Sequence, residues 1–299
     1  MITDKYENNT NALAYLEHGA FYEAQELLRK NVRNTPCCFT LNNLGMFYWE
    51  YGICSESGEV RRAERWGLHY LLCAAKFLTD HINQANLGYV YWQKNMFEKA
   101  SLYFSSAWNL SKCKEYAYNI GCCLYMQRQY VEAAEWFDSL CECDVWEEYG
   151  DIVSPLLVSA FCRFYAGDDA QCLAAVNAYC ERYDAGDRYH VFLLRFLLRD
   201  YKAAIEEWNL LQTQWYPSVE LCAILAMCFR DMPASIATPK YIEAEKWCKC
   251  GGKSLSTYLQ SPEKCNMVLQ SSTFYPHPMR HCGYYGCTMH QTPIPPMEA

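Results

Sequence analysis

The feature that most constrains this chain is an internal repeat of 33 residues. Between residues 86–107 and 119–140, like residues recur at this spacing: Asn86 and Asn119, Gly88 and Gly121, Ala100 and Ala133, Phe104 and Phe137. A period of this length is typical of helix–turn–helix units that stack side by side. Glycine inside a helix costs about 1 kcal/mol relative to alanine. The two glycines therefore indicate that a second helix passes too close for a side chain.

Further units extend this pattern on both sides. Upstream, residues 12–36 form one unit, and Leu44-Gly45 with Tyr48 opens another. The second helix of that unit is expected near residues 60–77, after an insertion rich in glycine and serine. Downstream, helical pairs are expected at residues 154–182, 188–215 and 218–250, which brings the count to about seven units.

The best unit has the pattern Leu87-Gly88-x2-Tyr91, then Ala100-x3-Phe104-x2-Ala107. It resembles the tetratricopeptide repeat (TPR) family, and the longer unit near Ala74-Ala75 is similar to Sel1-like repeats. The resemblance implies an all-α, right-handed superhelical solenoid of about seven helix-turn-helix (TPR-like) repeats over residues 1–252, best matched at 82–147.

The end of the chain has a different composition. Residues 253–272 are expected to form a capping helix, because the last repeat of a solenoid leaves an apolar face to be covered. Residues 273–299 are rich in proline, glycine, histidine and tyrosine. We expect this stretch to be an irregular tail.

Charge and hydropathy exclude several kinds of partner. The net charge is −8 and the pI about 5.4, with no block of lysine or arginine. Binding to phosphate backbones or anionic lipids relies on such blocks, so neither nucleic acid nor a membrane is expected as a partner. The first residues are polar, and no apolar run approaches the roughly 18 residues that span a bilayer. These observations predict a cytoplasmic protein.

The chain contains 19 cysteines. A disulfide framework suits small secreted domains, whereas free cysteine in a reducing compartment behaves as a small buried hydrophobe. We interpret most of these cysteines as structural thiols, with Cys248 at the core position that matches Phe104.

One polar residue recurs in the first helix of three units. Asn43, Asn86 and Asn119 each lie two residues before the repeat glycine; we call them the asparagine ladder. The family resemblance implies that first helices line a concave peptide groove. An amide can pair with a peptide backbone whatever the peptide's sequence. The alternative is that each asparagine hydrogen-bonds only the neighbouring helix.

Large side chains surround the asparagine ladder at helical spacing. Three and six residues after each asparagine, the same helix face returns. The candidate peptide-binding residues at these positions are Met46, Trp49, Tyr89, Trp92 and Tyr125. They predict an aromatic, weakly charged groove, although aromatic residues at helical spacing also form cores.

The tail holds a second candidate site. Its histidines and cysteines are His277, His281, Cys282, Cys287 and His290. These side chains suit Zn²⁺ or Cu(I), although their spacing matches no established zinc motif. No other cofactor is indicated.

The sequence favours a protein-interaction scaffold that binds a peptide or partner protein in its groove. Two alternatives remain open: a metal-handling or redox protein that acts through the tail, or a peptide-sensing regulator without a DNA-binding domain. No nucleophile, phosphate-loop or metalloprotease motif is present, so an enzyme is not expected.

Overall fold

The computed structural model describes residues 2–141, 152–183, 187–213, 217–232, 234–261, 263, 274–280 and 282–287. The chain divides into two compact units, and each is considered by itself. Residues 1–129 and 278–299 belong to unit 1, and residues 130–277 to unit 2.

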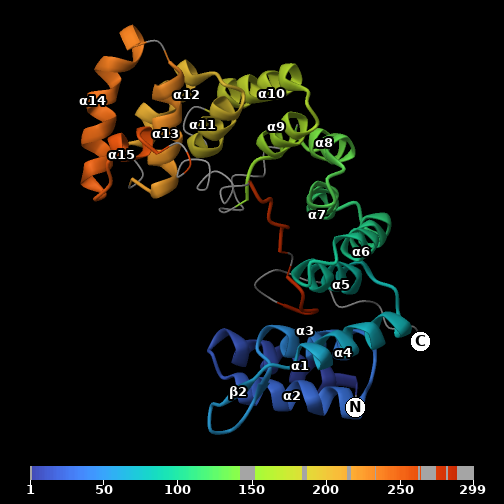
Figure 1. Ribbon diagram of the computed structural model, residues 1–299. Helices are drawn as coiled ribbons and strands as arrows, with labels where there is room; N and C mark the ends of the chain where they lie inside the picture. Colours follow the sequence, from blue (N-terminus) through green and yellow to red (C-terminus); the bar gives the residue numbers. More distant parts are fainter. Residues whose placement is uncertain are drawn as a thin grey trace. The chain divides into compact units, whose positions relative to one another are not determined.

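The described part of unit 1 consists of helices, one short hairpin and the irregular residues 278–280 and 282–287. Its helices are α1 (Ile2–Glu17), α2 (Phe21–Asn34), α3 (Cys38–Glu50), α4 (Glu64–Phe77), α5 (His81–Gln93), α6 (Phe97–Leu110) and α7 (Lys114–Met126). Consecutive helices pack on one another: α1 on α2, α3 on α4, α5 on α6 and α6 on α7 (Figure 1).

Unit 2 continues the same helical order. Its helices are α8 (Tyr130–Asp138), α9 (Pro155–Tyr165), α10 (Asp169–Arg182), α11 (Arg188–Leu197), α12 (Tyr201–Leu211), α13 (Val219–Asp231), α14 (Ala234–Cys250) and α15 (Leu255–Leu259). Within it, α8 packs on α9, α9 on α10 and α11 on α12. The all-α prediction is confirmed. Of the capping helix expected at 253–272, residues Leu255–Leu259 form α15; residues 262 and 264–272 lie outside the described residues.

The second helix of each pair buries one face through a repeated triplet. Its members are four and three positions apart, which places them on one side of a helix. The triplets are Ala24, Leu28 and Asn31; Gly67, Leu71 and Ala74; Ala100, Phe104 and Ala107; Ala133, Phe137 and Leu140; Cys172, Val176 and Tyr179; and Ala204, Trp208 and Leu211. The spacing persists in unit 2, where the sequence likeness between repeats is weak.

The turn between the two helices also repeats in five of the pairs. Two residues after the first helix ends, the backbone takes a left-handed conformation at Gly19, Asn95, Arg128, Gly167 and Arg199, with φ between 56° and 82°. This conformation ends a helix because it lets backbone N–H groups beyond the helix donate to its last carbonyl oxygens. Met96 N, for example, donates to Tyr91 O at 2.9 Å. Glycine takes this conformation freely, and Asn95 tolerates it better than most residues.

The insertion before α4 forms a small hairpin. β1 (Ile53–Cys54) pairs antiparallel with β2 (Val60–Arg61). Gln25 of α2 fixes the hairpin, because its amide accepts from Cys54 N at 3.0 Å and donates to Cys54 O at 2.7 Å. The prediction that a helix begins near residue 60 was therefore wrong by about four residues, and α4 begins at Glu64.

Within the described ranges, every cysteine is a free thiol. Cys122, Cys123, Cys162 and Cys248 are fully buried, so they fill core positions as small apolar side chains do. Among the helices of the described ranges, none has both the length and the hydropathy that a bilayer crossing requires.

Candidate peptide-binding surface

Each residue of the asparagine ladder lies on the first helix of a repeat, and all three helices belong to unit 1. Asn43 belongs to α3, Asn86 to α5 and Asn119 to α7. Their exposed fractions are 0%, 4% and 2%. A buried amide without a hydrogen-bond partner costs about 1–3 kcal/mol, so each of these side chains needs partners. All three find them in a part of the chain that is distant in sequence.

The partner is a stretch that we call the docked segment (residues 279–287, of which residue 281 is not described). Asn43 Oδ1 accepts from Tyr285 N at 2.9 Å, and Asn43 Nδ2 donates to Tyr285 O at 3.0 Å. Asn119 pairs with Met279 in the same way: Asn119 Oδ1 accepts from Met279 N at 2.6 Å, and Asn119 Nδ2 donates to Met279 O at 2.9 Å. Each amide thus satisfies both backbone groups of one residue. Figure 1 shows the docked segment in red beside α3 and α5.

Two backbone carbonyls of the docked segment each accept two asparagine amides. Gly283 O accepts from Asn42 Nδ2 at 2.8 Å and from Asn86 Nδ2 at 2.9 Å. Tyr285 O accepts from Asn9 Nδ2 at 3.0 Å in addition to Asn43. A carbonyl oxygen has two lone pairs, so both carbonyls are saturated. Gly283 O thus binds α3 and α5, whereas Tyr285 O, two positions later, binds α1 and α3.

The asparagines also hold one another in place. Asn42 Oδ1 accepts from Asn86 Nδ2 at 3.0 Å, which links α3 to α5. Asn9 Oδ1 accepts from Asn43 Nδ2 at 2.7 Å, which links α1 to α3. We call the surface that α1, α3, α5 and α7 form around Asn9, Asn42, Asn43, Asn86 and Asn119 the asparagine face.

The sequence analysis did not select Asn9 or Asn42. Asn42 directly precedes Asn43, so its place in the helix was a usable signal. Asn9 lies in α1, which lacks the repeat glycine two residues further on, and no spacing in the sequence indicated it.

Tyr285 is the most deeply buried side chain of the docked segment, with 0% exposed. It packs into a cluster with Phe39, Ala74 and Ile82. Its hydroxyl donates to Asp80 Oδ1 at 2.6 Å and lies 3.7 Å from the Cys38 thiol. Burial raises the pKa of Tyr285 far above its ordinary value, so the phenol stays protonated and serves as a donor.

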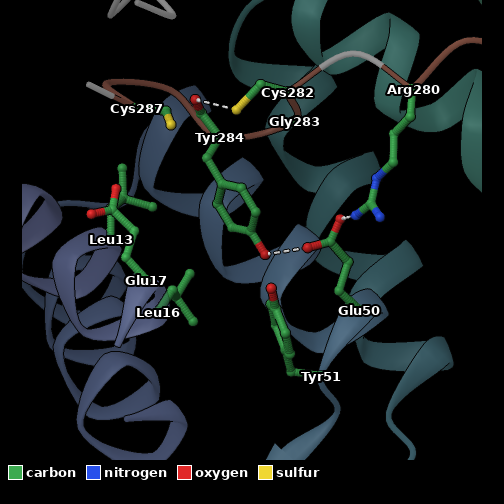
Figure 2. Close-up of a pocket in the computed structure, with 10 residues that line it drawn as sticks. All are labelled: Leu13, Leu16, Glu17, Glu50, Tyr51, Arg280, Cys282, Gly283, Tyr284 and Cys287. Carbon is green, nitrogen blue, oxygen red and sulfur yellow. Dashed lines mark hydrogen bonds and ion pairs between the residues drawn. The ribbon is translucent and has the colours of Figure 1, made fainter. Parts of the chain in front are cut away.

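Tyr284 and Arg280 meet on one carboxylate. Tyr284 Oη donates to Glu50 Oε2 at 2.8 Å, and the Arg280 guanidinium pairs with the same carboxylate (Figure 2). Arg280 also lies over the Tyr89 ring, 5.6 Å from its centroid. Glu50 ends α3, so the docked segment is held by side chains as well as by its backbone.

A cavity of about 350 Å³ remains beside the docked segment. Leu13, Leu16 and Glu17 of α1 line one side, and Cys282, Tyr284 and Cys287 line another (Figure 2). Such a space could hold several waters. The docked segment therefore leaves a space on this side of α1 that its side chains do not fill.

The predicted aromatic and methionine residues lie in different surroundings. Met46 lies next to Gly283, and Tyr89 lies under Arg280. Trp49 donates to Gln93 Oε1 and has Lys94 over its ring. Trp92 packs edge-on against Phe97 of α6, which places it in the helix core. Tyr125 is buried in α7.

The described candidate metal ligands do not form a cluster. His277 belongs to unit 2 and is exposed, whereas Cys282 and Cys287 belong to unit 1. His281 and His290 lie outside the described residues. In the part of the chain that is described, no three histidine, cysteine or carboxylate side chains gather as a metal site would require.

This arrangement is that of a tetratricopeptide-repeat-like protein. The crystal structure of a tetratricopeptide repeat protein from Parabacteroides merdae is similar to this chain, with a TM-score of 0.58 and 17% sequence identity over 89% of this chain and 99% of that chain. Yeast Tom70 gives a TM-score of 0.42 and 11% identity over 83% of this chain and 50% of that chain. No protein-family model matches the sequence, and no curated protein matches it. The similarity to the Parabacteroides merdae structure confirms the predicted TPR-like fold.

Proposed function

We propose that this chain is a protein-interaction scaffold whose asparagine face binds an extended peptide of a partner protein. The observation that carries the proposal is the pairing of Asn43 and Asn119 with both the N–H and the C=O of a single residue. Such pairing recognises main chain, which every peptide offers.

The number of these bonds supports the proposal. Among the described residues, seven hydrogen bonds join asparagine amides to the backbone of the docked segment. Each contributes about 0.5–1.5 kcal/mol net. Without an extended chain, the bonds from Asn86 to Asn42 and from Asn43 to Asn9 would remain, but water would have to replace all seven bonds to the docked segment. The site therefore suits a peptide better than a compact small molecule.

Charge supports the same class of partner. With a net charge of −8, the chain is a poor match for nucleic acid or an anionic membrane. Glu50 and Asp80 at the asparagine face contact a guanidinium and a phenol. The proposed ligand is accordingly a neutral to basic peptide.

The test compares three full-length baits in a pull-down from native lysate. They are the wild type, an Asn43/Asn86/Asn119→Ala triple variant, and Asn109→Ala, which changes an exposed asparagine of α6. Circular dichroism establishes that each is folded. We expect a partner that the wild type and Asn109→Ala capture and the triple variant loses, with hydrogen-exchange protection in α3, α5 and α7 when that partner is bound. Capture of the same partner by the folded triple variant would refute the proposal.

A further inference from the structure

We infer that the docked segment is an intramolecular stand-in for the partner, and that the partner peptide carries the pattern Gly-x-Tyr and binds by displacing it. This inference rests on the proposed function and adds the identity of the ligand and its competitor. It is carried by three features of the docked segment: the lack of space for a side chain at Gly283, the pocket of Tyr285, and the cavity against α1.

The position of Gly283 accepts glycine for steric reasons. A Cβ at this residue would lie 2.6 Å from Asn86 Oδ1 and 2.8 Å from Met46 Cε. Asn86 cannot withdraw cheaply, because its amide nitrogen is bonded to both Asn42 Oδ1 and Gly283 O. A larger residue would break the contacts that hold the peptide carbonyl. The asparagine face therefore selects glycine here.

Two residues later the surface selects tyrosine. The Tyr285 ring fills an apolar cluster, and its hydroxyl reaches Asp80 Oδ1 at 2.6 Å. Asp80 caps α5 by accepting from Ile82 N at 2.9 Å, so the carboxylate is fixed in place. A phenylalanine would fill the cluster and leave this carboxylate oxygen short of a donor. A site that hydrogen-bonds a ligand's hydroxyl group strongly rejects ligands that lack this group.

Arginine before the glycine contributes less to selection. Arg280 pairs with Glu50 and lies over Tyr89, but its side chain is 56% exposed. Exposed ion pairs add little to affinity and more to the rate of association. The pattern that specifies the ligand is therefore Gly-x-Tyr, and a basic residue upstream assists.

The docked segment is suited to exchange with such a peptide. Its described residues form no helix or strand, and they leave the cavity of about 350 Å³ against α1. Being part of the same chain, it competes at an effective concentration of about a millimolar. A free peptide of the same sequence should bind the wild-type chain weakly, and should bind well once the attached copy is impaired.

The probe is a fluorescein-labelled peptide with the sequence of residues 278–287, followed by fluorescence anisotropy under reducing conditions. The proteins are the full-length wild type, Gly283→Val, and Gly283→Val combined with the Asn43/Asn86/Asn119→Ala changes. We expect Gly283→Val to bind the peptide about tenfold or more tightly than the wild type. The combined variant should not bind it.

Matched peptides test the pattern on the Gly283→Val protein. Replacing the peptide's first glycine by alanine should weaken binding about tenfold, and replacing its second tyrosine by phenylalanine should do so to a similar degree. Replacing the first tyrosine by phenylalanine should have a smaller effect. If all four peptides bind equally, the pattern is wrong.

A measurement on the wild-type chain keeps the inference testable if Gly283→Val fails to fold. Excess peptide should speed hydrogen exchange in the chain's own docked segment, read from fragments that extend past residue 287. Equal peptide binding by the wild type and Gly283→Val, or unchanged hydrogen exchange, would overturn the proposed competition.

Two other outcomes would each overturn a different part. A wild-type dimer that becomes monomeric in Gly283→Val would show that the bound segment comes from a second copy of the chain, and would overturn the intramolecular contact. If a partner is retained through the asparagine ladder while this peptide binds no variant, the inference fails and the proposed function stands.

Discussion

At Gly88, helix propensity and packing act in opposite directions. Alanine is favoured over glycine inside a helix by about 1 kcal/mol. Yet a Cβ at Gly88 would lie 2.8 Å from the Phe104 ring, and Phe104 is 1% exposed in α6. The sequence repeat indicated this close approach, and the structure identifies the ring that causes it.

We therefore predict that Gly88→Ala destabilises the protein, by about 1–3 kcal/mol, because the added methyl group overpacks the α5–α6 interface. Urea unfolding followed by circular dichroism measures the change. A Gly88→Ala/Phe104→Leu double variant should lose less stability than the sum of the two single changes, since the smaller side chain makes room. A rise in stability for Gly88→Ala would show that propensity outweighs packing.

At the scale of the element, aspartate side chains cap the N-termini of several helices and fix where those helices begin. Asp80, Asp168, Asp187 and Asp200 each precede a helix and accept a backbone N–H of its first turn. Asp187 also pairs with His190 Nδ1 at 2.5 Å. Burial alone would raise the pKa of Asp187, but the hydrogen bonds and charge of His190 outweigh it and lower that pKa.

We predict that Asp187→Ala lowers the free energy of unfolding by about 1 kcal/mol at neutral pH. The folded carboxyl has a lower pKa than the unfolded one, so its contribution is complete above about pH 4–5 and is lost as pH falls through the folded value. Between pH 6 and pH 3 the wild type should lose more stability than Asp187→Asn, which keeps a capping oxygen without the charge. Parallel urea curves at both pH values check this, and an equal loss in both proteins would contradict the ionic part of the cap.

At the scale of the whole molecule, cysteine is used as a core residue in both units. Burial raises the pKa of the Cys123, Cys162 and Cys228 thiols well above the ordinary value, and that of Cys38 to about 11. The thiolate is the reactive form. Cys250, in contrast, is exposed at the end of α14.

We predict that, among the described cysteines, iodoacetamide at pH 8 alkylates Cys250 first in the native protein. Cys123, Cys162 and Cys228 should remain unmodified until urea unfolds the chain, after which all four should react at similar rates. Peptide mapping by mass spectrometry follows each site. Early alkylation of the three buried thiols in the absence of urea would contradict their place in the core.

Much of the fold was determined by the sequence because its signals are local. Six second helices bury a face through residues three and four positions apart, and five pairs turn two residues after their first helix. These patterns lie within about 33 residues of one another, so a repeat makes them visible. The spacing of Asn43, Asn86 and Asn119 was visible for the same reason.

What those asparagines hold was decided by the tertiary structure alone. Tyr285 is 242 residues from Asn43, and Met279 is 160 from Asn119, with no periodicity to relate them. The asparagine amides bind main-chain groups, which every residue carries. No residue type in the sequence could therefore mark their partner. Asn9 and Asp80 likewise gain their roles only when α1, α3 and α5 pack and the docked segment returns to them. Local sequence patterns thus determine the helical repeat. The binding of the docked segment to the asparagine face depends on contacts between distant residues that only folding brings together.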